Sequence, residues 1–414
     1  MKLSVAICSY AHDIMMKKVI AYREAGVFFT ALLIFSVVIF FLTITDINSH
    51  ADYIGHVIKG TMKPPANFLY YLIIYCAAFF QTKSVYLYSA SAVVLSVAVT
   101  AKFMITRNII ASCTFKTSSA NDAADRFITV ISAMLILVFS IPTGMLAGGH
   151  YYLGHITPTV WHNSTTIFLM PFALLLFWVS YQQLIAPTNR RMLFITMLCI
   201  LNILIKPSFY FVFCIAYPLM LLRSFGIRKK MWANLIPVLT GSALLLAEYI
   251  LIYTYDYGNA YTEKVTISIS PFSIWSHFTP NIPLALTGSL LFPLVYLLFY
   301  GRDLMNNLLL QYAALAYMIA LVIFSVFSET GPRQFSGNFY WQCIVSAYIL
   351  FMVAALLTVG KVVRARKSGT DGPITLILET NWKNKILLSC FFLHTIAGIV
   401  FLGYLITLGK TVGS

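Results

Sequence analysis

Charged residues are scarce in this chain. Only 10% of its 414 residues are Asp, Glu, Lys or Arg, whereas 60% are hydrophobic. Soluble globular domains carry about 25% charged residues, so this composition excludes an ordinary soluble fold. Apolar stretches fill the chain, and the loops between them are short, which leaves no room for a separate soluble domain. We therefore expect one all-α polytopic membrane domain spanning residues 1–414.

Paired cysteines, a cleavage site and nucleic-acid motifs are also missing. The seven cysteines are scattered, mostly inside apolar stretches, and indicate neither a disulfide framework nor a metal site. Residues 1–25 are too polar for the core of a signal peptide, so we expect an uncleaved cytoplasmic or interfacial segment. The net charge of +15 is not accompanied by basic runs interleaved with exposed aromatics. No nucleic-acid partner is predicted.

Basic residues suggest how the apolar segments cross the membrane. Twelve segments can be read, at roughly 27–45, 67–81, 85–106, 127–147, 166–184, 193–205, 209–222, 233–253, 284–300, 308–327, 340–359 and 386–407. If 67–106 makes only one net crossing, most of the 28 Lys and Arg fall on one side, as expected for the cytoplasm. That arrangement predicts about 11 crossings, a cytoplasmic N-terminus and a short or re-entrant piece.

With this topology, most of the polar residues with candidate functional roles lie on the outer face. The expected connections are outer loops at 46–66, 148–165, 254–283 and 328–339, and a cytoplasmic loop at 360–385. This one-sided distribution indicates that the functional site lies outside.

The first outer loop opens on four titratable residues, Asp46, His50, Asp52 and His56. Asp46 follows the first span directly, where partial desolvation would keep its carboxylate ready to accept a proton from a bound hydroxyl. A short helix would put Asp46 and His50 on one face and turn Asp52 away. The alternative is that these are ordinary interfacial polar residues.

The second outer loop combines aromatic rings with hydrogen-bonding groups at Trp161, His162 and Asn163. Such a mixture is suited to stacking on sugar rings and to hydrogen bonding with them. Trp161 would serve equally well in an interfacial aromatic belt. His150 and His155 lack companion ligands of matching spacing, so the sequence predicts no metal site here.

Two outer cations, Lys206 and Arg333, lie near helix ends against the membrane. Lys206 begins a Lys-Pro turn, and Arg333 lies between Glu329 and Asn338, just after a span. An ammonium and a guanidinium at headgroup depth form a receptor for a phosphate carried on a lipid. The alternatives are snorkelling of Lys206 and a local ion pair between Glu329 and Arg333.

One acid, Glu248, lies within the apolar segment 233–253, toward its outer end. An acid within a span is a functional candidate by default, and Lys206 is its expected partner if the neighbouring segments pack together. A purely structural buried pair stays open.

These pieces together resemble the GT-C superfamily of polyprenyl-phosphate-sugar-dependent glycosyltransferases. The matching pieces are Asp46 with His50, Pro64 to Tyr70, Trp161 to Asn163, Ile205 to Pro207, and Glu329 to Arg333. The resemblance implies inverting transfer of a sugar from a polyprenyl phosphate to a glycan or lipid-linked glycan. It implies a catalytic base at Asp46 with His50 beside it, and a phosphate held by Lys206 and Arg333.

In length the chain is similar to the small phage-type serotype-converting O-antigen glucosyltransferases. That similarity implies a multi-pass protein of the bacterial inner membrane with a periplasmic site. Two adjacent first-loop carboxylates, often seen in the superfamily, are absent because Asp46 and Asp52 are separated. The identity of the base and the involvement of a divalent cation are therefore open, and no other cofactor is expected.

The alternative functions are a transporter or flippase of lipid-linked sugars, or an O-antigen polymerase or ligase. A transporter carries polar residues near the bilayer midplane, whereas here polarity gathers on one face. A polymerase would be expected to use arginines in two large outer loops. We therefore predict a transferase, with membrane lipids around it. Its expected substrate-binding residues are Asp52, His56, Trp161, His162, Asn163, Lys206, Glu248, Glu329, Arg333 and Asn338.

Overall fold

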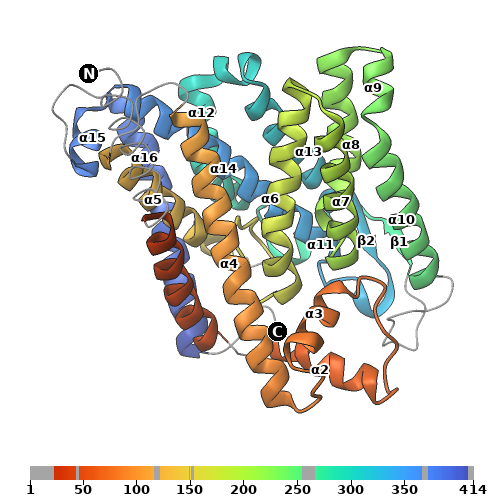
Figure 1. The fold of residues 1–414 in the computed structure, drawn as a ribbon. Helices are drawn as coiled ribbons and strands as arrows, with labels where there is room; N and C mark the ends of the chain where they lie inside the picture. Colours follow the sequence, from red (N-terminus) through yellow and green to blue (C-terminus); the bar gives the residue numbers. More distant parts are fainter. Residues whose placement is uncertain are drawn as a thin grey trace, which may run out of the picture.

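The computed structural model is almost entirely helical (Figure 1). It describes residues 23–42, 46–115, 122–148, 150, 153–253, 266–365 and 372–408. Within these ranges, eight helices are long and apolar enough to cross a membrane. The chain is therefore an all-α, multi-pass membrane protein, as its composition predicts.

The spanning helices are distributed along the whole described chain. They are Arg23–Phe41, α4 (Ser84–Thr114), α6 (Ser164–Ile185), α8 (Ser208–Phe225), α12 (Ile282–Asn306), α13 (Leu308–Val326), α14 (Trp341–Arg364) and α16 (Trp382–Leu408). The remaining α-helices are α2 (Asp46–Ile58), α3 (Leu69–Ala77), α5 (Asp122–Leu137), α7 (Asn189–Ile205), α9 (Lys229–Ala233), α10 (Ile236–Tyr253), α11 (Ser273–Phe278) and α15 (Pro373–Glu379).

Short elements complete the fold. The 3-10 helices are η1 (Thr143–Ala147), η2 (Gly331–Arg333) and η3 (Asn338–Tyr340), and the strands are β1 (Ile267–Ile269) and β2 (Phe327–Glu329). The two strands pair antiparallel, with Ile267 opposite Glu329. The sequence does not predict this small sheet, because three-residue strands are too short for an alternating pattern to be read.

Each predicted apolar segment contains a helix, but two of these helices are shorter than expected. In the segment 67–81, α3 has nine residues and a length of about 14 Å, half of a hydrocarbon core of about 30 Å. It is a short piece of the kind that the charge pattern requires. In the segment 127–147, α5 ends at Leu137, and Pro142 lacks the N–H that a continuing helix needs.

The backbone N–H and C=O groups of the irregular segment after α5 form hydrogen bonds with neighbouring helices. Phe139 donates its N–H to the carbonyl of His394 on α16, and its own carbonyl contacts Nδ1 of the same histidine at 2.6 Å. Ile141 donates to the carbonyl of Gly288 on α12. Non-helical backbone at membrane depth is tolerated where protein supplies such partners.

The core is organised around α14, which is enclosed on almost every side. Of its apolar stretch, 89% is buried, against α13, α4, α8 and α12. Because α14 is held so firmly, its first residue, Trp341, is fixed in place at one end of the molecule.

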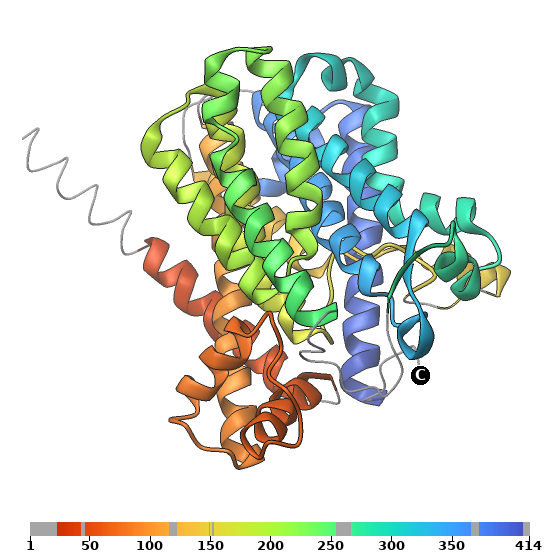
Figure 2. The ribbon, with the colours of Figure 1, turned by 90° about the vertical axis from the view of Figure 1, so that its right-hand side faces the viewer.

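That end differs chemically from the opposite one. Both views show α2 and α3 together at one end, beside α4, while α9 and α15 lie at the other (Figures 1 and 2). The opposite end carries basic helix termini, among them Arg190, Arg223, Lys229 and Arg364. It also holds the buried Arg107 guanidinium, which bonds Asp125 and Glu24.

Candidate functional site

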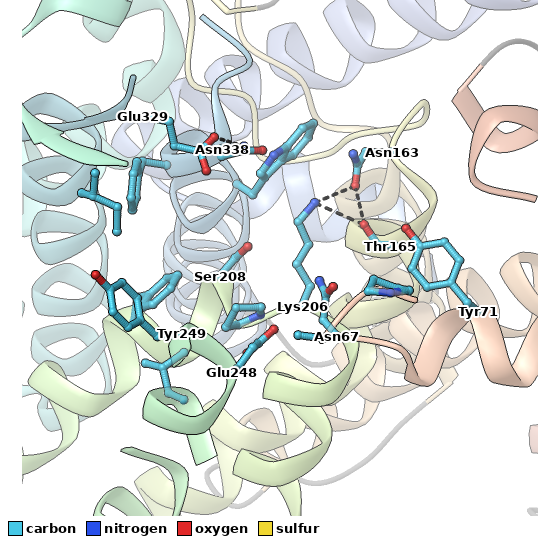
Figure 3. Close-up of a pocket in the computed structure, with 18 of the residues that line it drawn as sticks. Asn67, Tyr71, Asn163, Thr165, Lys206, Ser208, Glu248, Tyr249, Glu329 and Asn338 are labelled. Carbon is cyan, nitrogen blue, oxygen red and sulfur yellow. Dashed lines mark hydrogen bonds between the residues drawn. The ribbon is translucent and has the colours of Figure 1, made fainter. Parts of the chain in front are cut away.

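A cavity of about 710 Å³ lies at the end formed by α2 and α3 (Figure 3). Its walls are mostly helix ends: the start of α6, the junction of α7 and α8, the last turns of α10, and the start of α14. The helix α2, the segment before α3 and the pair β1–β2 complete it. A volume of this size suits a small-molecule ligand or part of a larger one.

Proline sets the backbone at the centre of the site. A residue before proline is pushed out of the helical region, and Lys206 accordingly takes φ −171° and ψ 118° at the end of α7. Pro207 then precedes the first residue of α8. The break between the two helices directs the Lys206 side chain toward the start of α6.

The Lys206 ammonium is held at the N-terminus of α6. Nζ donates to Asn163 Oδ1 at 2.9 Å, to Thr166 Oγ1 at 2.9 Å and to Thr165 Oγ1 at 3.2 Å. It also lies 4.1 Å from the centre of the Trp341 ring. Asn163 caps α6 by accepting the Thr166 N–H. A helix N-terminus carries partial positive charge, so the helix and the ammonium both favour an anion here.

Two histidines beside Lys206 are uncharged near neutral pH. Burial, and secondarily the Lys206 ammonium, lowers the pKa of His50 to about 4, and the same causes lower the pKa of His162 to about 4. His50 Nδ1 lies 2.8 Å from the Tyr71 hydroxyl and faces the cavity. His162 does not line the cavity, and its ring centre lies 6.2 Å from that of Trp341.

Two acids line the cavity from other elements. Glu248, on α10, is 6% exposed, and its Oε2 has no hydrogen-bond partner among the described residues. Glu329, at the end of β2, is equally buried and accepts a hydrogen bond from Asn338 Nδ2. The expected pairing of Lys206 with Glu248 is not formed, because α6 supplies the ammonium with oxygen acceptors at its own N-terminus.

The cavity brings together residues from distant parts of the sequence. Six of the residues predicted from sequence line it: His50, Asn163, Lys206, Glu248, Glu329 and Asn338. They come from six different elements or junctions, so only the tertiary fold makes them neighbours.

Four predicted binding residues do not line the cavity: Asp52, His56, Trp161 and His162. Asp52 faces α4 and accepts hydrogen bonds from Tyr88 at 2.8 Å and Ser84 at 3.3 Å. Its position two residues after His50 turns it to another face of α2. His56 is exposed and contacts Thr61, and Trp161 is buried in the core at 2% exposure.

The side chains of Asp46 and Arg333 lie outside the described part of the structure. The backbone of α2 begins at Asp46, and η2 ends at Arg333. Much of the expected outer loop 254–283, namely residues 254–265, also lies outside the described residues.

Several cavity residues were not predicted as site residues. They include Tyr53, Asn67, Tyr71, Ser208, Ser242, Tyr249, Phe339 and Trp341. Tyr71 lies shortly after Pro64-Pro65, and Trp341 ends the polar stretch that begins at Glu329. The nearness of these motifs in the sequence was the only signal that could have identified the two residues as site residues. An aromatic residue at a span boundary has many uses, and sequence alone does not distinguish them.

No protein-family model and no curated protein matches the chain. Among the described residues, no group of three or more His, Cys, Asp or Glu could hold a metal ion. What the arrangement offers is a fixed cation at a helix N-terminus, a neutral imidazole, buried carboxyl groups and aromatic rings around one cavity. These groups are suited to binding a ligand that carries both an anion and hydroxyl groups.

Proposed function

We propose that this protein is an inverting glycosyltransferase of the GT-C type. It would move a sugar from a polyprenyl phosphate to a glycan or a lipid-linked glycan. The observation that carries the proposal is the Lys206 ammonium, positioned at the N-terminus of α6 within a cavity at one end of a membrane protein. No second function has an observation of comparable weight in its favour.

The phosphate of the donor would bind at Lys206. The ammonium already donates to Asn163, Thr165 and Thr166, so it would attract the phosphate through its fixed positive charge, and the α6 dipole adds to that attraction. Asn163, Thr165 and Thr166 keep the ammonium in place before the reaction, so little reorganisation is needed as negative charge grows on the leaving phosphate. Such preorganised stabilisation is the main task of the protein in this chemistry.

Asp46 would act as the base, an assignment that rests on the sequence resemblance. It begins α2, the helix that carries His50 into the cavity. Its carboxylate would take the proton of an acceptor hydroxyl as the hydroxyl oxygen bonds to the anomeric carbon. The bond from that carbon to the phosphate oxygen breaks, and the polyprenyl phosphate leaves with the electron pair. Attack opposite the leaving group inverts the anomeric centre.

The site would face the periplasm of a bacterial inner membrane. Basic residues mark the cytoplasmic side of membrane proteins, and the basic helix ends lie opposite the cavity. With α3 too short to cross, the helices are compatible with about 11 crossings and a cytoplasmic N-terminus. A lipid-linked donor could then reach the cavity from the outer leaflet.

The position of the cavity favours a transferase over a transporter. A transporter binds its cargo near the bilayer midplane, between spans that rearrange around it. Here the polar lining comes from helix ends and connecting segments, such as the junction at Lys206 and the start of α6.

The decisive experiment follows release of undecaprenyl phosphate from undecaprenyl-phosphate monosaccharides by the full chain in nanodiscs, with glycans extracted from membranes supplied as the acceptor. We expect Lys206→Gln to slow release about 100-fold or more, because the preorganised positive charge beside the developing anion is lost. Lys385→Gln, an exposed lysine at the opposite end, is the matched control and should retain the wild-type rate. A Lys206→Gln protein that releases the lipid at the wild-type rate would contradict the proposal.

A second variant tests the base. Asp46→Asn keeps the shape of the side chain but cannot accept the hydroxyl proton, and should lower the rate by about 100-fold or more with little change in donor affinity. The anomeric configuration of the product, read by NMR, should be opposite to that of the donor. Retention of configuration would contradict the inverting mechanism.

A further inference from the structure

The carboxyl group of Glu248 is buried in the cavity with one oxygen unsatisfied. The residue is 6% exposed, and Oε2 has no hydrogen-bond partner among the described residues. A buried polar atom in a native protein is almost always paired, because leaving it unpaired forfeits its hydration without return. Because Glu248 also lines the cavity, a ligand hydroxyl there could supply a hydrogen bond that the protein does not give its carboxyl group.

Three of the other polar groups that line the cavity are engaged elsewhere. Ser242, on the same helix, lies 3.1 Å from the Tyr210 hydroxyl, which donates to the carbonyl of Val238. Lys206 donates to the start of α6, and Asn338 donates to Glu329. These bonds hold the surrounding donors in positions other than against Glu248.

Glu248 and Lys206 reach the cavity at separate points. Figure 3 shows the ammonium beside Asn163 and Thr165, whereas the Glu248 carboxyl lies apart from them, on the side of the cavity formed by α10. A phosphate is attracted by the ammonium, whereas the carboxyl group offers hydrogen-bonding atoms to hydroxyl groups. A ligand with both a phosphate and hydroxyl groups would therefore bind in one direction only.

We propose that Glu248 binds hydroxyl groups of the sugar whose phosphate is held by Lys206. This assignment rests on the proposed function and adds a sugar subsite to it. Sugar hydroxyls can hydrogen-bond with a carboxyl group that lines the cavity, and the rings of Tyr249 and Phe339 line the same cavity. The polyprenyl chain offers no hydrogen-bond donor, so Glu248 would distinguish a sugar-carrying lipid from the bare lipid phosphate.

The test compares two kinds of probe on the full chain in nanodiscs. One is undecaprenyl phosphate, and the other is a set of undecaprenyl phosphates carrying glucose, galactose, mannose or N-acetylglucosamine. We expect Glu248→Ala to weaken binding of the preferred sugar lipid about 10- to 100-fold, while affinity for undecaprenyl phosphate stays within about twofold. Glu248→Gln keeps the side-chain shape and one acceptor oxygen, so it should lose less.

The controls separate this subsite from the proposed function. Lys206→Gln should weaken both kinds of probe, and Glu379→Gln, an exposed acid on α15, should weaken neither. If Lys206→Gln leaves both affinities unchanged, the phosphate site and the proposed function fail. If Lys206→Gln behaves as expected but Glu248→Ala affects neither probe, or both equally, only the sugar subsite is overturned. A wild-type protein that prefers no sugar lipid over undecaprenyl phosphate overturns it as well.

Discussion

At the scale of single residues, the site keeps its histidines neutral beside a lysine. Burial withdraws water from His50 and His162, and the neighbouring ammonium makes a second positive charge still less favourable. Lys206, by contrast, is surrounded by oxygen acceptors and an aromatic ring. The positive charge is therefore concentrated at one atom rather than spread over three side chains.

The lowered histidine pKa values make stability depend on pH in a defined window. Between pH 6.5 and about 4 the unfolded chain binds a proton at each histidine that the folded protein does not bind. Stability is therefore retained above pH 6.5 and falls as the pH drops through this window, by at most about 1.4 kcal/mol per pH unit for each histidine.

A double variant, His50→Gln with His162→Gln, isolates this effect from other titrating groups. Its apparent melting temperature in detergent should fall less steeply than that of the wild type between pH 6.5 and 4.5. Loss of the contact between His50 and Tyr71 would displace the whole curve without changing its slope. Parallel curves for the two proteins would contradict the assigned pKa values.

At the scale of elements, close contacts between helices replace the hydrogen bonds that broken helices lack. Where α5 ends, α16 approaches so closely that a Cβ atom on Gly398 would overlap the carbonyl oxygen of Leu137. This approach lets His394, one turn earlier on α16, bond both backbone groups of Phe139. Small residues permit such close packing between membrane helices.

Gly398→Ala should therefore destabilise the protein by about 1–3 kcal/mol or more, because the added methyl forces α16 away from α5. Gly403→Ala, on the same helix, is the matched control, since a Cβ atom there meets nothing within 4 Å. The control should be neutral or slightly stabilising, as alanine favours a helix over glycine. Thermal unfolding in detergent measures both, and equal melting temperatures for the two variants would contradict this account of the packing.

At the scale of the whole molecule, the two ends carry different groups of polar residues. The cavity lies at the end with α2 and α3, while basic helix termini and the buried Arg107 cluster lie at the other. In the proposed orientation, the basic end lies in the cytoplasm and the cavity lies on the outer side.

The direction can be measured by cysteine labelling in intact cells. In a chain whose seven cysteines are replaced by serine, Lys59→Cys lies near the cavity and Ile227→Cys lies at the opposite end. A membrane-impermeant maleimide should label Lys59→Cys directly and Ile227→Cys only after the membrane is opened. Labelling of both positions from the same side would contradict the proposed orientation, and reversed labelling would place the cavity in the cytoplasm.

The sequence by itself determined the fold class, because apolar runs long enough to span a bilayer have few alternatives to membrane helices. It also located the helix break at Lys206-Pro207, since proline geometry is a local property. The charge asymmetry of the whole chain predicted a short or re-entrant piece within 67–106, where the structure has the nine-residue α3. The side of α2 that carries His50 follows from helical spacing in the same way.

Only the tertiary structure decided which polar residues share a cavity. Asn163, Lys206, Glu248 and Trp341 come from four elements, and their neighbourhood depends on how α6, α7, α10 and α14 pack. Trp161 and Trp341 are both buried tryptophans beside a span, yet only Trp341 lines the cavity, where it lies under the ammonium. Residue type and spacing do not distinguish them, because side-chain burial in a helical bundle depends on contacts between segments far apart in the chain.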